Sequence, residues 1–248
     1  MALLLSEEWN AWRGRNPNVT PDLTDADMKG RDLSGKDLKR ADLSRADLKG
    51  TSLAAADFSR ATLFEARFED VSAPGAIFES CVLDFLDFSG AFLAGARLKS
   101  ASLQSCALVG TNLAGADLSR AFLDGANLSD ANLAGANVSE SSFRGARTSG
   151  THFDGADLSR TLFEGVSLAQ GSFPNANFEA ANLKSADLTG ADLRRARLVR
   201  ASLRQAALNA ANCEGADFTD ADLDQASAIE ADFSGVCFDR AKLRKMDL

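Results

Sequence analysis

A hydrophobic residue recurs every five residues along most of this chain. It falls on every residue number ending in 3 or 8, from Leu23 to Leu248, which gives 46 consecutive units without an insertion. Of these 46 central positions, 28 are Leu and 12 are Phe, and the exceptions are Met28, Ala73, Val138, Thr148, Cys213 and Ala228. The position two residues before the centre is Ala in 30 units, and the position just before the centre is mostly Asp, Asn or Ser. A repeat this regular has to be the basis of the fold.

A period of five fits neither of the two regular elements. In an α-helix, five residues rotate the side chain by about 500°, so the central residues would never share one face. In a strand, an odd period sends successive centres to opposite sides. The chain therefore has to turn a corner in every unit, which returns each centre to one shared interior. This predicts a solenoid whose stacked coils surround a continuous hydrophobic core.

Units such as ADLSR (41–45), ADLKG (46–50) and ADLTG (186–190) resemble the A(D/N)LXX unit of the pentapeptide-repeat family. The resemblance covers residues 21–248. It implies an all-β fold, a right-handed quadrilateral β-helix in which four units form one coil, with the central residue and the small residue two before it facing inside. On that geometry the 46 units make about 11.5 coils spaced about 4.8 Å apart.

Residues 1–20 precede the repeat and are expected to form a cap and a linker. The stretch SEEWNAWR has Ser6 in position to be an N-cap, two acidic residues in the first turn, and Trp9 and Trp12 three residues apart on one face. Prolines follow it. The pattern predicts a short helix over residues 3–13 whose two Trp side chains cover the first coil.

One stretch, GRDLSGKD (30–37), differs at a single position from the phosphate-binding loop GxxxxGK[ST]. It has the glycines and Lys36, but Asp37 stands where the loop needs a hydroxyl group for Mg²⁺, and a carboxylate there would repel phosphates. The stretch is better explained as parts of two ordinary units with Leu33 and Leu38 as centres.

Residues that could carry catalysis or hold a metal are scarce. The single His, His152, is at an outward position, and the four Cys show no CxxC pairing, which argues against zinc sites and His-dependent nucleophilic catalysis. Cys81, Cys106 and Cys213 are at inward positions and are expected to be small core residues, whereas Cys237 points outward and could be reactive. We therefore expect a protein that is not an enzyme and that has no cofactor and no metal.

The charge of the chain limits its partners. The net charge is −8 and the pI is about 4.8, which argues against direct nucleic-acid binding. The apolar run at residues 2–5 is too short for a signal peptide or a membrane span, so no membrane association and a cytoplasmic location are expected. Asp recurs at positions 22, 27, 32, 37, 42 and 47, but a four-sided coil spreads these side chains over four faces. They are expected to be solvated repeat positions rather than a metal site or a DNA-mimicking stripe.

Hydrophobic residues at outward positions mark a candidate partner-binding patch. Most lie between residues 64 and 92, where the units depart from the consensus and Leu86 stands where Ala is expected. An exposed apolar patch is typical of an interface; a local distortion that tucks these side chains away is the alternative. The patch residues are Phe64, Ile77, Val82, Phe85, Phe92, Phe122 and Leu162, of which Val82, Phe122 and Leu162 share one face because they are separated by whole coils.

These observations predict a non-enzymatic solenoid scaffold that binds a protein partner through its flat faces. The resemblance implies an alternative, because some members of the family protect DNA gyrase, a type II topoisomerase, from inhibitors by mimicking duplex DNA. The charge fits this alternative poorly, since duplex DNA carries about one charge per 1.7 Å. The segment 181–215 even has 3 acidic and 6 basic residues.

The last coil ends on Leu243, Met246 and Leu248, which no later residue covers. An uncovered coil exposes both apolar side chains and an unpaired backbone edge. A two-fold contact between two such ends is the simplest closed arrangement. We therefore predict a homodimer through the C-terminal coil.

Overall fold

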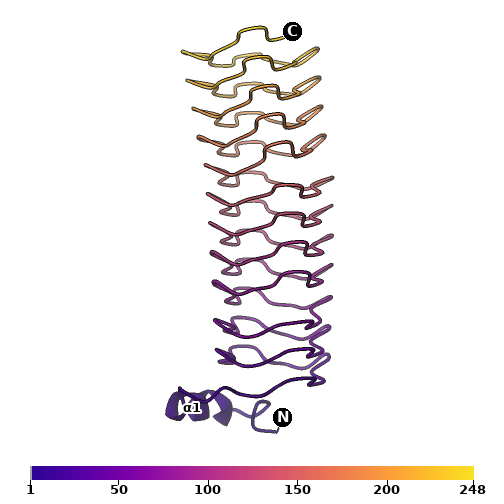
Figure 1. Cartoon of the computed structure of the whole chain (residues 1–248), viewed down its shortest axis with the longest axis vertical. Coiled ribbons are helices and arrows are strands. Elements are labelled where there is room, and N and C mark those ends of the chain that lie inside the picture. Colours follow the sequence, from indigo (N-terminus) through magenta and orange to yellow (C-terminus); the bar gives the residue numbers. More distant parts are fainter. Residues whose placement is uncertain (1) are drawn as a thin grey trace.

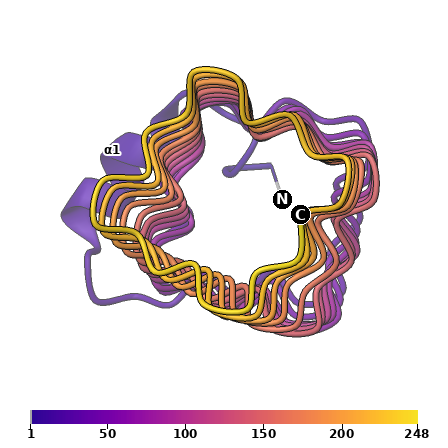
Figure 2. The ribbon, with the colours of Figure 1, turned by 90° about the horizontal axis from the view of Figure 1, so that it is seen from above.

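The computed structural model describes residues 2–248, in which the repeat forms a stack of coils along one axis (Figure 1). Each residue just before a centre pairs in a parallel bridge with the residue 20 positions later, from Asp22 with Asp42 to Ser227 with Asp247. Four units therefore complete one coil. Seen along the axis, the coils superpose around a common interior (Figure 2). The fold is an all-β solenoid, as the repeat predicts.

The sides of the coil are too short to form extended strands. Each unit contributes one bridged residue and then turns a corner, in which the N–H of Ala116 donates to the carbonyl of Leu113 over 3.0 Å. The corner residue has φ between 54° and 70° in all 45 units from residue 25 to residue 245, as a type II turn requires. Because 28 of these corner residues are not Gly, the hydrogen bonds of the stack must hold the left-handed conformation.

Where Asp or Asn precedes a centre, its side chain can stabilise the following corner. Its side-chain oxygen accepts a hydrogen bond from the backbone N–H two residues later, as in Asp42 with Ser44 (3.0 Å) and Asp117 with Ser119 (3.0 Å). Asn112 makes the same contact. The recurring Asp residues therefore serve the turns on all four faces. No group of three or more potential metal ligands occurs in the part of the chain that the structure describes.

The core consists of stacked columns of central residues. Leu113 and its neighbours in the middle of the stack are completely buried. Phe58 and Phe78 stack with their ring centroids 4.8 Å apart, as do Phe143 and Phe163. This distance equals the spacing of hydrogen-bonded strands, so stacked rings fit the coil repeat without strain.

The helix begins later than the sequence predicts. The only helix within residues 2–248, α1, spans Glu8–Arg15 rather than residues 3–13 (Figure 1). Ser6 is not its N-cap, because the Ser6 hydroxyl donates to the carbonyl of Leu3 in a preceding turn, over 2.8 Å. The N-cap is Glu7, which makes no side-chain capping bond. No helix among residues 2–248 has the length and hydrophobicity to cross a membrane.

Helix α1 covers one side of the first coil by replacing the backbone partners of a preceding coil. The indole N–H of Trp9 donates to the carbonyl of Asp37 (2.8 Å), and the side chain of Asn10 accepts from the N–H of Asp37 (2.9 Å). Arg13 donates to the carbonyl of Lys39 over 2.7 Å. The segment before α1 lies inside the outline of the coils (Figure 2), where the side chain of Leu4 is buried.

The last coil has no such cover within the described residues. Leu243 and Leu248 are 42% and 77% exposed, and Met246 is half-buried. The structure thus leaves these three side chains at an open end of the stack.

Candidate functional site

The hydrogen-bonded ladder between coils is interrupted at one place in the N-terminal third of the solenoid. On either side of it the ladder is regular, with Phe58 N donating to Ile77 O (2.8 Å) and Ala73 N to Phe92 O (2.7 Å). Between these positions, six bonds that the repeat would place are absent. These are Arg60 N to Glu79 O, Leu63 N to Val82 O, Glu65 N to Asp84 O, Phe68 N to Asp87 O, Val82 N to Ala61 O and Asp87 N to Ala66 O.

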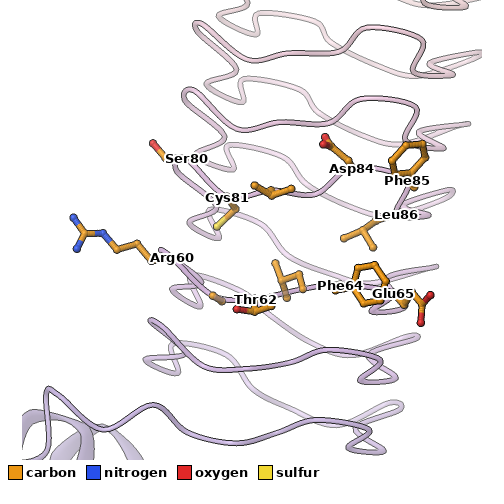
Figure 3. Close-up of a pocket in the computed structure, with 12 residues that line it drawn as sticks. Arg60, Thr62, Phe64, Glu65, Ser80, Cys81, Asp84, Phe85 and Leu86 are labelled. Atoms are coloured by element: carbon orange, nitrogen blue, oxygen red, sulfur yellow. The ribbon is translucent and has the colours of Figure 1, made fainter.

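The interruption opens a cleft of about 770 Å³ between two successive coils. One wall consists of residues 60–65 and the other of residues from the 80–86 segment (Figure 3). The bridge that would join Thr62 to Val82 is missing, although each of them is bridged to the coil on its other side, to Asp42 and to Ser102. The cleft is therefore a local separation of two coils within a continuous stack.

Leu86 accounts for the separation. It occupies the inward position where 30 of the 46 units have Ala, and its column has Ala66 below and Cys106 above. The Leu86 side chain is 5% exposed and lies between the two walls (Figure 3). The neighbouring rings of Phe68 and Phe88 keep a centroid distance of 4.9 Å, so the Phe column does not force the coils apart. The longer Leu side chain acts as a wedge.

Three large hydrophobic side chains are exposed at the rim of this cleft. Phe64 is 63% exposed, Val82 is 67% exposed and Phe85 is 79% exposed. A local distortion is therefore present, as one alternative from the sequence expects, yet it leaves these side chains in solvent instead of tucking them away.

Two further predicted residues continue the same face. Successive bridges align Val82, Ser102, Phe122, Ser142 and Leu162 in one column. Phe122 is 49% exposed and Leu162 is half-buried. We call Phe64, Val82, Phe85, Phe122 and Leu162 together the apolar patch.

The structure separates the remaining two predicted residues from this patch. Phe92, which is 42% exposed, is bridged to Ser72 and belongs to a different side of the coil. Ile77 is half-buried in a third column, bridged to Asp57. Neither residue adds to the surface around the cleft.

The two ends of the cleft carry opposite charges. Arg60 lies at one end and Glu65 at the other (Figure 3), and neither makes an ion pair within residues 2–248. Asp84, on the opposite wall, is held in place, since its carboxylate accepts from the Ser102 hydroxyl (2.5 Å) and from the Gln104 N–H (2.9 Å). Arg60 and Glu65 are thus free to bind charges of a partner.

The cysteines lie where the repeat places them. Cys81, Cys106 and Cys213 are buried, and burial raises the pKa of the Cys81 thiol to about 11 and of the other two to about 12. The Cys81 thiol donates to the carbonyl of Phe58 over 3.1 Å. These thiols therefore stay protonated at neutral pH and are poor nucleophiles. Cys237 is half-buried.

The single His lies on the surface. His152 is 61% exposed, and its Nδ1 lies 3.8 Å from the carboxylate of Asp154. Within residues 2–248 it belongs to no group of three or more His, Cys, Asp or Glu side chains that could hold a metal ion.

A second interruption of the ladder lies where Thr148 replaces a central Leu. The Thr148 hydroxyl donates to the Ser167 carbonyl there, over 2.5 Å. Five backbone bonds that the repeat would place are absent, namely Gly145 N to Glu164 O, Thr148 N to Ser167 O, Gly150 N to Ala169 O, Ser167 N to Ala146 O and Ser172 N to Thr151 O. A side chain of the solenoid thus takes over one of these partners. Around Leu63 and Val82 no side chain does so.

Two family models match the chain. One, described as pentapeptide repeats (8 copies), matches seven segments between residues 22 and 244, and the other, a pentapeptide repeat region, matches residues 96–173. No curated protein sequence matches the chain.

Several solved structures are similar to the chain. HetL, a pentapeptide repeat protein involved in heterocyst differentiation regulation from the cyanobacterium Nostoc sp. strain PCC 7120, is 28% identical, with 95% of this chain and 94% of that chain covered and a TM-score of 0.34. Full-length QnrB1, a plasmid-mediated fluoroquinolone resistance protein, is 15% identical, with 90% and 94% covered and a TM-score of 0.36. A pentapeptide repeat protein from the Arabidopsis thaliana thylakoid lumen is 28% identical, with 54% and 69% covered and a TM-score of 0.22.

Proposed function

Because the chain belongs to the pentapeptide-repeat family, we propose that it is a non-catalytic scaffold that binds a protein partner through the apolar patch. The observation that carries the proposal is the exposure of Phe64, Val82 and Phe85, each more than 60% accessible, around one cleft. Large exposed side chains gathered in one place are costly in water unless a partner covers them.

The apolar side chains of the central column support a protein partner. The central column of the patch alternates apolar Val82, Phe122 and Leu162 with Ser102 and Ser142. The Ser102 hydroxyl donates to Asp84 and the Ser142 hydroxyl donates to Asp124, so the apolar side chains of the column are the ones left to contact a partner. Phe side chains bury a large area each and are suited to act as anchors.

A comparative capture experiment tests this function. Purified Val82→Ser/Phe122→Ser protein and Phe92→Ser protein are compared with the unmodified protein for retention of partners from a lysate of the organism that encodes it. Phe92 is the matched control, because its exposure is similar to that of Phe122 but it belongs to another side of the coil. We expect the double variant alone to lose the partner.

Thermal unfolding of both variants should change little, since exposed side chains contribute little to the core. If the double variant unfolds, or if it retains every partner that the unmodified protein retains, the patch is not the binding surface.

The gyrase-protecting alternative receives no support from the surface charge. Basic residues on the solenoid pair with acidic residues of neighbouring units or coils, as in Arg45 with Asp25 (2.7 Å) and Arg240 with Asp220 (2.6 Å). Paired charges of both signs do not reproduce the uniform negative potential of duplex DNA. A supercoiling assay with purified gyrase and a fluoroquinolone separates the two functions: protection of the enzyme would favour mimicry.

Homodimerisation through the C-terminal coil is a separate proposal, supported by the exposure of Leu243 and Leu248. Multi-angle light scattering at micromolar concentration should report a dimer that Leu248→Glu with Met246→Lys converts to a monomer. A monomeric unmodified protein would rule it out.

A further inference from the structure

We infer that the cleft binds an extended peptide segment of the partner, which adds as a strand to the open ladder between residues 60–65 and 80–86. This inference rests on the proposed scaffold function and specifies the chemistry of the bound partner. It follows from three features of the cleft: the backbone groups that have lost their ladder partners, the direction in which those groups run, and the charges at the two ends.

The walls of the cleft present backbone groups in the geometry of a β-ladder. On one wall the N–H of Leu63 and the carbonyl of Ala61 have no ladder partner, and on the other wall the same holds for the N–H and the carbonyl of Val82. These groups are expected to be spaced as in a parallel bridge, because the equivalent groups of the next two coils do pair. There, Leu83 N donates to Ser102 O over 2.7 Å. Only another extended backbone offers donors and acceptors with this spacing.

The register of a bound segment follows from the ladder. The carbonyl of its middle residue accepts from Leu63 N, and the N–H of the same residue donates to Ala61 O. On the other wall, the N–H of the following residue donates to Val82 O, and the carbonyl of the preceding residue accepts from Val82 N. The middle side chain then points outward beside Thr62 and Val82. Its two neighbours point inward, one between Ala61 and Cys81 and the other between Leu63 and Leu83, because these residues flank Thr62 and Val82 in the repeat.

The direction of the segment sets the charges that it should carry. Every bridge in the solenoid is parallel, so the segment runs in the same direction as residues 61–65, with its N-terminal end beside Arg60 and its C-terminal end beside Glu65. Arg60 and Glu65 make no ion pair with other described residues. The ligand is therefore a short stretch that reads acidic, apolar, polar, apolar, basic.

The probe for the test is the peptide acetyl-Asp-Val-Thr-Val-Lys-amide, added to the full-length protein. Hydrogen exchange of the Leu63 and Val82 amides is measured with and without peptide, and the amide of Leu83, paired in the structure, is the internal control. Without peptide, both cleft amides should exchange much faster than Leu83. Saturating peptide should slow the exchange of Leu63, Val82 or both by at least about tenfold.

Two control peptides distinguish strand addition from nonspecific hydrophobic binding. The peptide N-methylated at the Thr amide lacks the donor for Ala61, so its affinity should fall by about tenfold. The peptide with Asp and Lys exchanged places each charge next to a like charge and should also bind more weakly. Neither control depends on the folding of a variant protein.

The protein variant Leu86→Ala removes the wedge. The ladder should then close, the Leu63 and Val82 amides should become protected without peptide, and the peptide should no longer bind. Phe122→Ser, two coils away, should bind the peptide unchanged.

Three results would overturn the inference. The first is an unchanged exchange of both cleft amides at millimolar peptide, and the second is equal affinity of the N-methylated peptide. The third is that, without peptide, both amides become protected from exchange as the concentration of the unmodified protein rises. The occupant of the cleft would then be a second copy of the chain. If the peptide does not bind but the Val82→Ser/Phe122→Ser variant still loses its partner, strand addition is wrong and the proposed scaffold function is retained.

Discussion

We expect that Leu86→Ala does not destabilise the protein, although it truncates a buried side chain. Leu86 is 5% exposed, and truncating a buried Leu to Ala ordinarily costs about 2–5 kcal/mol of stability. At this position Ala is the residue that the repeat prefers, and the Leu side chain occupies the gap in which backbone hydrogen bonds are missing. Its removal lets the two coils approach.

The magnitude follows from the number of bonds that closure restores. Six ladder bonds are absent beside Leu86, and a backbone hydrogen bond contributes about 0.5–1.5 kcal/mol net, so that closure regains about 3–9 kcal/mol. Set against the loss of about 2–5 kcal/mol, the change in the free energy of unfolding should lie between a loss of about 2 and a gain of about 7 kcal/mol, with its midpoint at a gain of about 2–3 kcal/mol. For a protein of this size each kcal/mol shifts the melting temperature by about 2–4 °C.

The matched control is Leu113→Ala, because Leu113 is completely buried and its ladder bond to Asn132 O is intact at 2.7 Å. Thermal melts and denaturant titrations followed by circular dichroism should show a clear loss for Leu113→Ala and none for Leu86→Ala. The two are compared by their midpoints under identical conditions, since a solenoid need not unfold in one step. A loss for Leu86→Ala as large as that for Leu113→Ala would refute the wedge.

Three more predictions test the register, the turn chemistry and the thiols. Leu113→Asp should be severely destabilising, because it buries a carboxylate without a partner. Asp117→Asn should be mild, because Asn keeps the side-chain oxygen that accepts the hydrogen bond from the Ser119 N–H. Equal losses of stability in the two variants would mean that the register is wrong. Hydrogen bonds from the Ser44 hydroxyl and then its N–H lower the pKa of Asp42 below the usual 3.8. Such groups stabilise the fold above about pH 5, so melting temperatures should be flat there and fall as the pH drops through the lowered pKa; a flat profile down to pH 2 would contradict this. Iodoacetamide at pH 8 should label Cys237 well before the three buried thiols, as mass spectrometry of the peptides would show.

The repeat itself made most of the fold predictable. Centres at every fifth residue can share one interior only if the chain turns in each unit, and the bridges at intervals of 20 residues agree with the four-sided coil that the resemblance implies. The start of α1 was not predictable from capping rules, because Ser6 bonds backward to Leu3 and the helix is positioned by tertiary contacts of Trp9 and Arg13 with the first coil. Tertiary contacts outweigh local preferences in so short a helix.

The candidate site was predictable only in part. Outward hydrophobic residues stand out against a regular repeat, which is why Phe64, Val82 and Phe85 could be singled out. The cleft between them could not be, since it depends on whether the stack absorbs the extra volume of Leu86 or separates. The one signal in the sequence was a Leu at an inward position that is usually Ala. Thr148 is also out of pattern, and there a hydroxyl replaces one of five missing backbone bonds.

A solenoid can open on one side because each coil contacts only its neighbours. Around the cleft, the ladder resumes at Phe58 and at Ala73, and the rings of Phe68 and Phe88 stay stacked at 4.9 Å, so the core remains continuous while one side is separated. The open backbone groups are therefore held in place before any partner arrives, and binding does not have to order them. We therefore propose that one enlarged inward side chain, Leu86, separates two coils whose open backbone edges form the binding site.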